Sequence, residues 1–125
     1  MRIDATGPRT PDEVWRLYTR PSTWPDWAPQ ISSVRGVHDP ITPGAEGVVH
    51  GPLLLRVPFV IESVDEAARR WTWRVGLGPL SVVLDHGVEE LESGCRAWAE
   101  VHAPYLLALP YSPLARLALR RLVGG

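Results

Sequence analysis

The side chain with the clearest potential for chemistry is the imidazole of His86. It lies in a stretch of alternating apolar and polar residues, which is typical of a β-strand with one buried face, and it falls on the apolar face. A buried imidazole needs a hydrogen-bond partner, or it loses roughly 1–3 kcal/mol of solvation. The partner could be a bound ligand, or it could be Ser63, a backbone carbonyl or water. With a ligand, the near-neutral pKa of histidine suits proton transfer at an enolisable substrate, as general base or acid.

Four tryptophans are candidates to surround such a ligand. Trp71 is expected beside His86, where its indole N–H could orient a substrate carbonyl, and Trp73 is expected on the same face as part of the core. Trp24 and Trp27 lie in the proline-rich segment 21–29, which predicts a short cap with at most one helical turn. They either pack only as a cap or border a pocket for an aromatic ligand, because an indole offers a large apolar face and one donor. The candidate catalytic residue is His86, and the candidate ligand-binding residues are Trp24, Trp27, Ser63, Trp71, Trp73 and His86.

Turn residues predict how these side chains come to share one face. A two-residue turn at Gly78-Pro79 predicts an antiparallel hairpin that places Trp71 opposite His86. The same register pairs Trp73 with Leu84, and Val75 with Val82. The preceding strand, residues 57–64, is expected next in the sheet, with Ser63 beside Trp71 and Ile61 beside Trp73. A second turn at Ser93-Gly94 predicts these pairs: His86 with Val101, Val88 with Ala99, and Glu90 with Ala97.

The remaining pattern places a helix near each end of the chain. Thr10-Pro11-Asp12-Glu13 is a capping box that predicts the start of a short helix, which Pro21 ends. Strand patterns begin at about Ile31, and Ser112-Pro113 predicts a terminal helix that runs to about Leu122. The predicted order is one strand, two short helices, six strands and one terminal helix, which is an α+β fold.

Several other chemistries are disfavoured by the sequence. The four histidines are scattered over strands and loops without the spacing of metal ligands; they are His38, His50, His86 and His102. Cys95 has no base beside it in sequence, and Gly76-x-Gly78 precedes a strand rather than the helix of a dinucleotide-binding loop. We therefore expect no metal and no cofactor.

Composition limits the class of protein and its partners. A chain of 125 residues suits a single domain, residues 1–125, and the net charge of −1 disfavours nucleic acid as a partner. Lysine is absent, which excludes Schiff-base chemistry by a lysine amine. Without a signal peptide or an apolar run of 18 residues, we expect a cytoplasmic protein that does not insert stably into membranes. Three arginines of the terminal helix could touch a membrane surface or simply form a solvated edge: Arg116, Arg120 and Arg121.

Short motifs along nearly the whole chain resemble the START-like, helix-grip (SRPBCC) superfamily, in its polyketide cyclase/dehydratase-like branch. The matching residues, in chain order, are Pro11-x-x-Val14-Trp15, Trp24-x-x-Trp27-x-Pro29, Pro58-Phe59-x-Ile61, Val64-Asp65, Arg70-x-x-Trp73, Asp85-His86-x-Val88-Glu89 and Gly94-Cys95-Arg96. The resemblance implies a curved antiparallel sheet of about seven strands around a C-terminal helix, with an apolar ligand cavity between them. The terminal helix departs from the family pattern, because Pro110 and Pro113 interrupt it and it is short.

Three functions are compatible with this resemblance. The first is a polyketide cyclase or dehydratase that uses His86, and Trp71 beside it, to handle protons and orient a reactive chain. The second is a non-catalytic carrier or sensor of a lipid or another small apolar or aromatic molecule. The third is a protein-interaction module of the same fold. The sequence alone does not separate these functions, because fold does not determine function.

Overall fold

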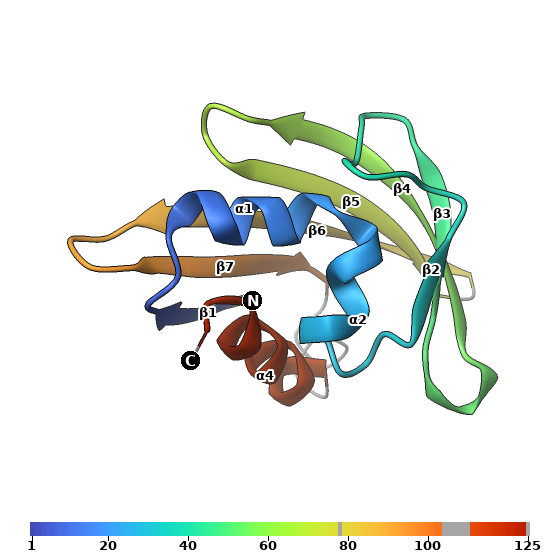
Figure 1. The fold of residues 1–125 in the computed structure, drawn as a ribbon. Coiled ribbons are helices and arrows are strands. Elements are labelled where there is room, and N and C mark those ends of the chain that lie inside the picture. Colours follow the sequence, from blue (N-terminus) through green and yellow to red (C-terminus); the bar gives the residue numbers. More distant parts are fainter. Residues whose placement is uncertain (78, 104–110, 125) are drawn as a thin grey trace.

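The computed structural model describes residues 1–77, 79–103 and 111–124. Within these residues seven strands form one antiparallel sheet, in the spatial order β1-β7-β6-β5-β4-β3-β2 (Figure 1). The strands are β1 (Arg2–Gly7), β2 (Ser33–Arg35), β3 (Glu46–His50), β4 (Arg56–Asp65), β5 (Arg70–Leu77), β6 (Leu80–Glu90) and β7 (Cys95–His102).

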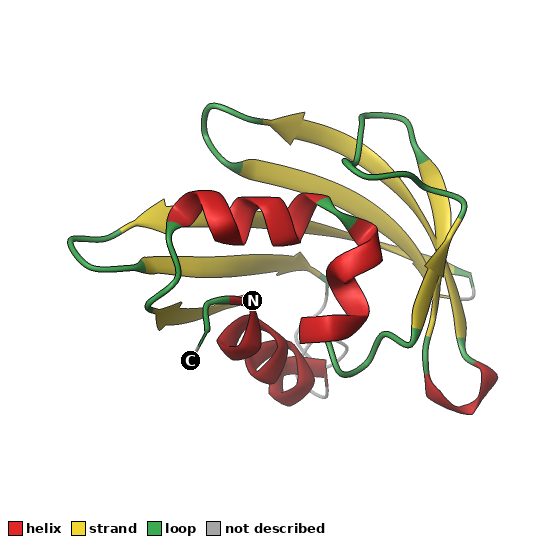
Figure 2. Cartoon of the chain, viewed as in Figure 1, coloured by secondary structure: helices red, strands yellow, loops and turns green. Residues whose placement is uncertain are grey.

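The helices of the described chain lie on one face of this curved sheet (Figure 2). They are α1 (Pro11–Thr19), α2 (Trp24–Trp27) and α4 (Ser112–Leu122), with single 3-10 turns η1 (Pro21–Thr23) and η2 (Pro52–Leu54). The predicted order of elements and the α+β helix-grip architecture are therefore confirmed. No described helix is long and apolar enough to cross a bilayer.

Helix α1 begins where the capping signal predicts. The Thr10 hydroxyl accepts a hydrogen bond from the backbone N–H of Glu13, which satisfies one of the free donors of the first turn. Val14, Trp15 and Tyr18 form the buried side of the helix. The Tyr18 hydroxyl donates to the backbone carbonyl of Trp98 at 2.9 Å, so α1 is attached to β7 through a buried hydrogen bond.

The register of β5 against β6 agrees with the prediction from the turn. Trp71 pairs with His86, Trp73 with Leu84 and Val75 with Val82. Gly78 itself lies outside the described residues. Because side chains alternate along a strand, this register directs Trp71, Trp73 and His86 to the concave face, and all three are buried.

The register of β6 against β7 differs from the prediction by two residues. His86 pairs with Ala99 and Glu90 with Cys95, because a four-residue turn joins the strands, with a hydrogen bond from the N–H of Leu91 to the carbonyl of Gly94. Gly94 has a φ of +81°, and a Cβ there would lie 2.0 Å from the carbonyl oxygen of Gly7. The shift is an even number, so the predicted faces of β6 and β7 are unchanged.

The predicted position of Ser63 is wrong. Ile61 pairs with Trp73 as expected, but a β-bulge at Glu62 inserts one extra residue, so Ser63 pairs with Thr72. Ser63 is exposed, and Val64 instead lies opposite Trp71. Glu62 lies at the surface, where it forms an ion pair with Arg74 at 2.8 Å.

Helix α4 spans Ser112–Leu122 as predicted, whereas Pro110 lies outside the described residues. Its buried side is made of Ser112, Ala115, Ala118, Leu119 and Leu122. The carbonyls at its C-terminal end accept hydrogen bonds from the Arg9 guanidinium, at 2.9 Å from the oxygens of both Arg121 and Leu122. This end of α4 is therefore attached to the loop after β1.

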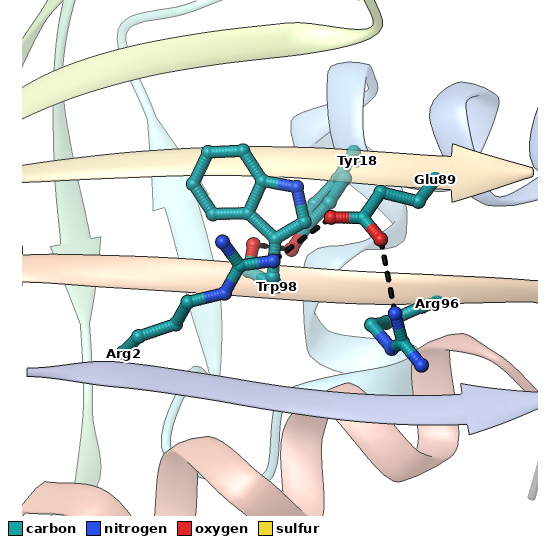
Figure 3. Close-up of polar contacts among 5 residues, drawn as sticks. All are labelled: Arg2, Tyr18, Glu89, Arg96 and Trp98. Carbon is teal, nitrogen blue, oxygen red and sulfur yellow. Dashed lines mark hydrogen bonds and ion pairs between the residues drawn. The ribbon is translucent and has the colours of Figure 1, made fainter.

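Trp98 is a large aromatic side chain on the convex face of the sheet. Its ring lies over Gly87, and the guanidinium carbons of Arg2 and Arg70 lie 4.8 and 5.2 Å from the ring centroid. Arg2 also donates to one oxygen of the Glu89 carboxylate at 2.9 Å, and Arg96 donates to the other oxygen at 3.1 Å. Figure 3 shows both contacts. These contacts keep Trp98 only 8% exposed.

Gly87→Ala should destabilise the protein through this packing. The new Cβ would lie 2.4 Å from the Trp98 ring, so the ring or the strand must move, at a cost of about 1–3 kcal/mol in the free energy of unfolding. Urea denaturation measures the change. Gly76→Ala on β5 is the matched control, because the nearest atom to its Cβ would be Pro58 Cγ at 3.3 Å. Equal stability of the two variants would contradict this account of Gly87.

Candidate functional site

Two adjoining chambers lie between the concave face of the sheet and the helices. The large chamber has a volume of about 320 Å³ and borders the surface, where Leu55 and Leu114 are half-exposed. The small chamber has a volume of about 50 Å³ and contains Tyr18, Trp71 and His86 in its wall. Both chambers share the wall residues Gln30, Ile31, Trp73, Leu84, Val101 and Tyr111.

The walls of both chambers are predominantly apolar. None of the described residues that line them is Asp, Glu, Lys or Arg. The large chamber is lined mainly by aliphatic side chains, which come from β3 to β7, from the loop that contains η2 and from Ile31, Ala103 and Leu114. Such a wall favours an apolar ligand and offers an ion no partner.

A stack of three rings forms the side of the small chamber. The His86 imidazole lies on the Trp71 indole, with centroids 3.9 Å apart and planes 9° apart, and Trp24 stacks on Trp71 at 5.6 Å. Tyr18 meets Trp71, His86 and Trp27 edge-on, at 5.7 to 5.8 Å. The stack joins the helical cap to β5 and β6 through side-chain contacts alone.

Buried polar atoms without a partner gather around the small chamber. In the described part of the chain five buried side-chain polar atoms have no hydrogen-bond partner, and every one belongs to a residue of this wall. They are Trp27 Nε1, Gln30 Oε1, Trp71 Nε1, Trp73 Nε1 and His86 Nδ1. Buried polar groups in folded proteins are rarely unpaired, so this concentration marks a place where polar groups of another molecule can bind.

Burial sets the protonation of the site. It lowers the pKa of the His86 imidazole to about 3, although the Trp71 backbone and the Asp85 carboxylate act in the opposite direction. Burial also raises the pKa of the Tyr18 hydroxyl well above its usual value. At neutral pH both side chains are uncharged, so they act on a ligand through hydrogen bonds rather than through charge.

Residues 2–125 match the family model for polyketide cyclase / dehydrase and lipid transport. The chain belongs to this family. Its match covers the whole sheet, all described helices and both chambers, so the family fold includes the site described above. No curated protein matches the sequence.

Solved structures with little sequence identity share this family fold. Ara h 8.0201 is 15% identical, with a TM-score of 0.72 over 100% of this chain and 97% of its own. The di-domain ARO/CYC BexL from the BE-7585A biosynthetic pathway is 17% identical, with a TM-score of 0.77 over 98% of this chain and 44% of its own. DynU16, a putative protein in the dynemicin biosynthetic locus, is 19% identical, with a TM-score of 0.73 over 99% of this chain and 47% of its own.

Five of the six candidate residues come together in this family member. Trp27, Trp71, Trp73 and His86 line the small chamber, as does Trp24. The Trp24 indole N–H already donates to the Tyr18 carbonyl at 2.9 Å, so this side chain acts as packing. Ser63 is not in the wall of either chamber, because the bulge turns it to the outer surface.

Sequence reasoning missed three polar residues of the wall. Tyr18 was expected only as part of the apolar side of α1, and its central position depends on the contact between α1 and β7. Gln30 and Tyr111 come from distant segments and meet through a hydrogen bond of 3.2 Å from the Gln30 amide to the Tyr111 hydroxyl. Neither residue belongs to a motif that could have singled it out.

The low pKa of His86 predicts a specific pH dependence of stability. The folded state keeps His86 neutral down to about pH 3, whereas the unfolded chain takes up the proton near pH 6.5. Above pH 6.5 His86 is neutral in both states and costs the folded state nothing. As the pH falls from 6.5 towards 3, the free energy of unfolding decreases, by at most about 1.4 kcal/mol per pH unit. His86→Gln removes this decrease, so the free energy of unfolding of the variant should fall less steeply between pH 6.5 and 4.

Urea denaturation at half-unit pH steps measures both slopes. His38→Gln, the same substitution at an exposed position, is the matched control. Parallel curves for wild type and His86→Gln would show that His86 is not held neutral by the fold.

Proposed function

We propose that this protein binds a neutral, largely apolar molecule that carries a hydrogen-bond acceptor such as a carbonyl. The apolar part of the ligand occupies the large chamber, and the acceptor reaches the small chamber past Trp73, which lines both. The observation that carries the proposal is the gathering of the five unpartnered polar atoms beside an uncharged apolar cavity.

The donors of the small chamber favour an acceptor on the ligand. Three of the five atoms are indole nitrogens, which can only donate, on Trp27, Trp71 and Trp73. A ligand carbonyl that accepts from one of them would restore a hydrogen bond worth about 0.5–1.5 kcal/mol. His86 can donate or accept through Nδ1, depending on its tautomer, and therefore also suits a hydroxyl group.

The absence of charge in the described walls favours a neutral ligand. A carboxylate or phosphate would leave water without meeting a cation, at a cost of several kcal/mol. Free fatty acids and phosphorylated compounds are therefore poor candidates for full burial. Aromatic ketones and related polyketide-like molecules fit better, in keeping with the family description and with the ARO/CYC protein among the structural neighbours.

Three naphthalenes of nearly equal size test the preference for a neutral acceptor. In displacement of the fluorescent probe Nile red at pH 7, 2-acetylnaphthalene should be effective at about tenfold lower concentration than 2-ethylnaphthalene, which has no acceptor. 2-Naphthoate should require roughly 100-fold more than the ketone, because its carboxylate finds no cation. Equal displacement by ketone and carboxylate would contradict the proposed ligand class.

Two neighbouring residues of β6 test the place of binding. Val82→Phe adds a ring inside the large chamber and should weaken Nile red binding about tenfold or more, whereas Val83→Phe adds the same ring outside the chamber. Val83→Phe should bind as the wild type does. Equal binding by both variants would remove the large chamber from the site.

A second candidate is catalysis on such a ligand, as in a cyclase or dehydratase. The unpartnered Nδ1 of His86 favours it, because it could take a proton from the carbon beside a bound carbonyl and return it to a leaving hydroxyl. The low pKa of His86 makes it a weak base, so we rank this function below binding alone.

The dehydration of 4-hydroxy-4-phenyl-2-butanone to its enone tests this second candidate. The substrate loses one water molecule, and the conjugated product is followed by its ultraviolet absorbance. A catalytic protein should raise the rate above that of buffer, and His86→Gln should lower it by about 10² to 10⁴. A wild-type rate equal to that of buffer would leave ligand binding as the function.

A further inference from the structure

The surface around the large chamber carries exposed leucines on two separate elements. Leu54 and Leu55 lie at η2 and are 96% and 56% exposed, and Leu114 and Leu117 on α4 are 45% and 39% exposed. Leu55 and Leu114 also line the large chamber, so the two elements border its opening. Figure 2 shows η2, the short helix between β3 and β4, and α4 both at the lower edge of the molecule. We refer to these four leucines as the leucine rim.

Leu54 is held outward by its backbone. Its φ is +62°, in the left-handed region that residues with a Cβ other than Asn and Asp seldom adopt. The fold gains no packing from the Leu54 side chain in return, because almost all of it is exposed. A strained apolar residue without internal contacts points to a role outside the folded core.

The two chain segments that carry the leucine rim have charged side chains of one sign only, although the exposed Asp26 lies on α2, which packs against α4. Segments 47–61 and 101–125 contain none of the 14 acidic residues of the chain, but they contain four arginines: Arg56, Arg116, Arg120 and Arg121. All four are exposed, and none has an acidic partner among the described residues. The nearest acidic residues in sequence are Glu46, Glu62 and Glu100, which lie beyond these segments.

We propose that the leucine rim docks on the surface of an anionic lipid bilayer. Leucines would enter the interface between headgroups and acyl chains, and the arginines would contact anionic headgroups. A bilayer fits this surface better than a protein partner, because single leucines protrude from two elements around an opening rather than form a continuous groove. Docking would turn the large chamber towards the hydrocarbon region.

The purpose of docking rests on the proposed function. A docked protein would let an apolar ligand pass between the bilayer and the large chamber without crossing bulk water. The docking step itself is independent of any ligand. Vesicle binding and Nile red binding can therefore fail separately, and Leu54 and Leu117, which do not line either chamber, allow the two to be separated.

Sedimentation with vesicles tests the docking. The wild type should bind vesicles of equal phosphatidylglycerol and phosphatidylcholine, bind phosphatidylcholine vesicles at least tenfold more weakly, and lose binding in 0.5 M NaCl. Leu54→Asn removes the apolar side chain but places there a residue that tolerates a positive φ. This variant and Leu117→Ser should each weaken binding to the anionic vesicles about tenfold. Arg56→Gln and Arg116→Gln should each weaken it about fivefold.

Leu91→Ser is the matched control, because Leu91 follows Glu90, at the end of β6 away from Val82 and the large chamber. This variant should bind vesicles as the wild type does. Leu54→Asn should also retain Nile red binding in solution. Absence of wild-type binding to anionic vesicles would overturn the proposal, and so would full binding by Leu54→Asn and Leu117→Ser. Retention on polyglutamate without vesicle binding would indicate an acidic protein instead, and a dimer that Leu54→Asn dissociates would indicate a second copy of this chain.

Discussion

The contact between the Trp71 and His86 rings is the interaction on which the site depends. These residues are direct partners across β5 and β6, and their rings stack at 3.9 Å. Cross-strand partners are close enough for such stacking only in one register, since a slip of one strand by one residue would put the two rings on opposite faces of the sheet. The register also directs Trp73 inward, and Trp24 and Tyr18 pack on the pair from the helical side. This contact thus stabilises the register of the β5–β6 hairpin. It also provides the surface on which Trp24 and Tyr18 pack, and it forms part of the wall of the small chamber.

This arrangement carries a cost that the core offsets. Three indole nitrogens, an amide oxygen and an imidazole nitrogen are buried without partners, and each such group costs about 1–3 kcal/mol. The fold keeps His86 neutral rather than pairing it with a carboxylate, which avoids a buried charge but leaves Nδ1 unsatisfied. Polar groups of this kind stabilise a complex more than the free protein, because a ligand supplies what the fold does not.

Local signals in the sequence explain why much of the fold was predictable. The capping box at Thr10 and the register of β5 against β6 are each set by a few adjacent residues, and both predictions are confirmed. The errors occur where geometry depends on more than one segment. A two-residue turn at Ser93-Gly94 was expected. The structure has a four-residue turn instead, in which Gly94 lies against Gly7 of a distant segment. Alternation predicted Ser63 inside, and the bulge at Glu62 reversed it without a signal such as glycine. Gln30 and Tyr111 meet only through tertiary structure.

The crowding of indoles has an optical consequence. The ring centroids of Trp24, Trp71 and Trp73 lie 5.4 to 5.6 Å from one another, with planes 18°, 70° and 84° apart. Indoles this close share their excited states, and oblique transition dipoles give paired bands of opposite sign in circular dichroism. The sign and amplitude of such a couplet depend on ring orientation, so a tilt of one ring by a few degrees changes the spectrum. The cap and the sheet thus carry an internal chromophore that reports on the small chamber without any added label.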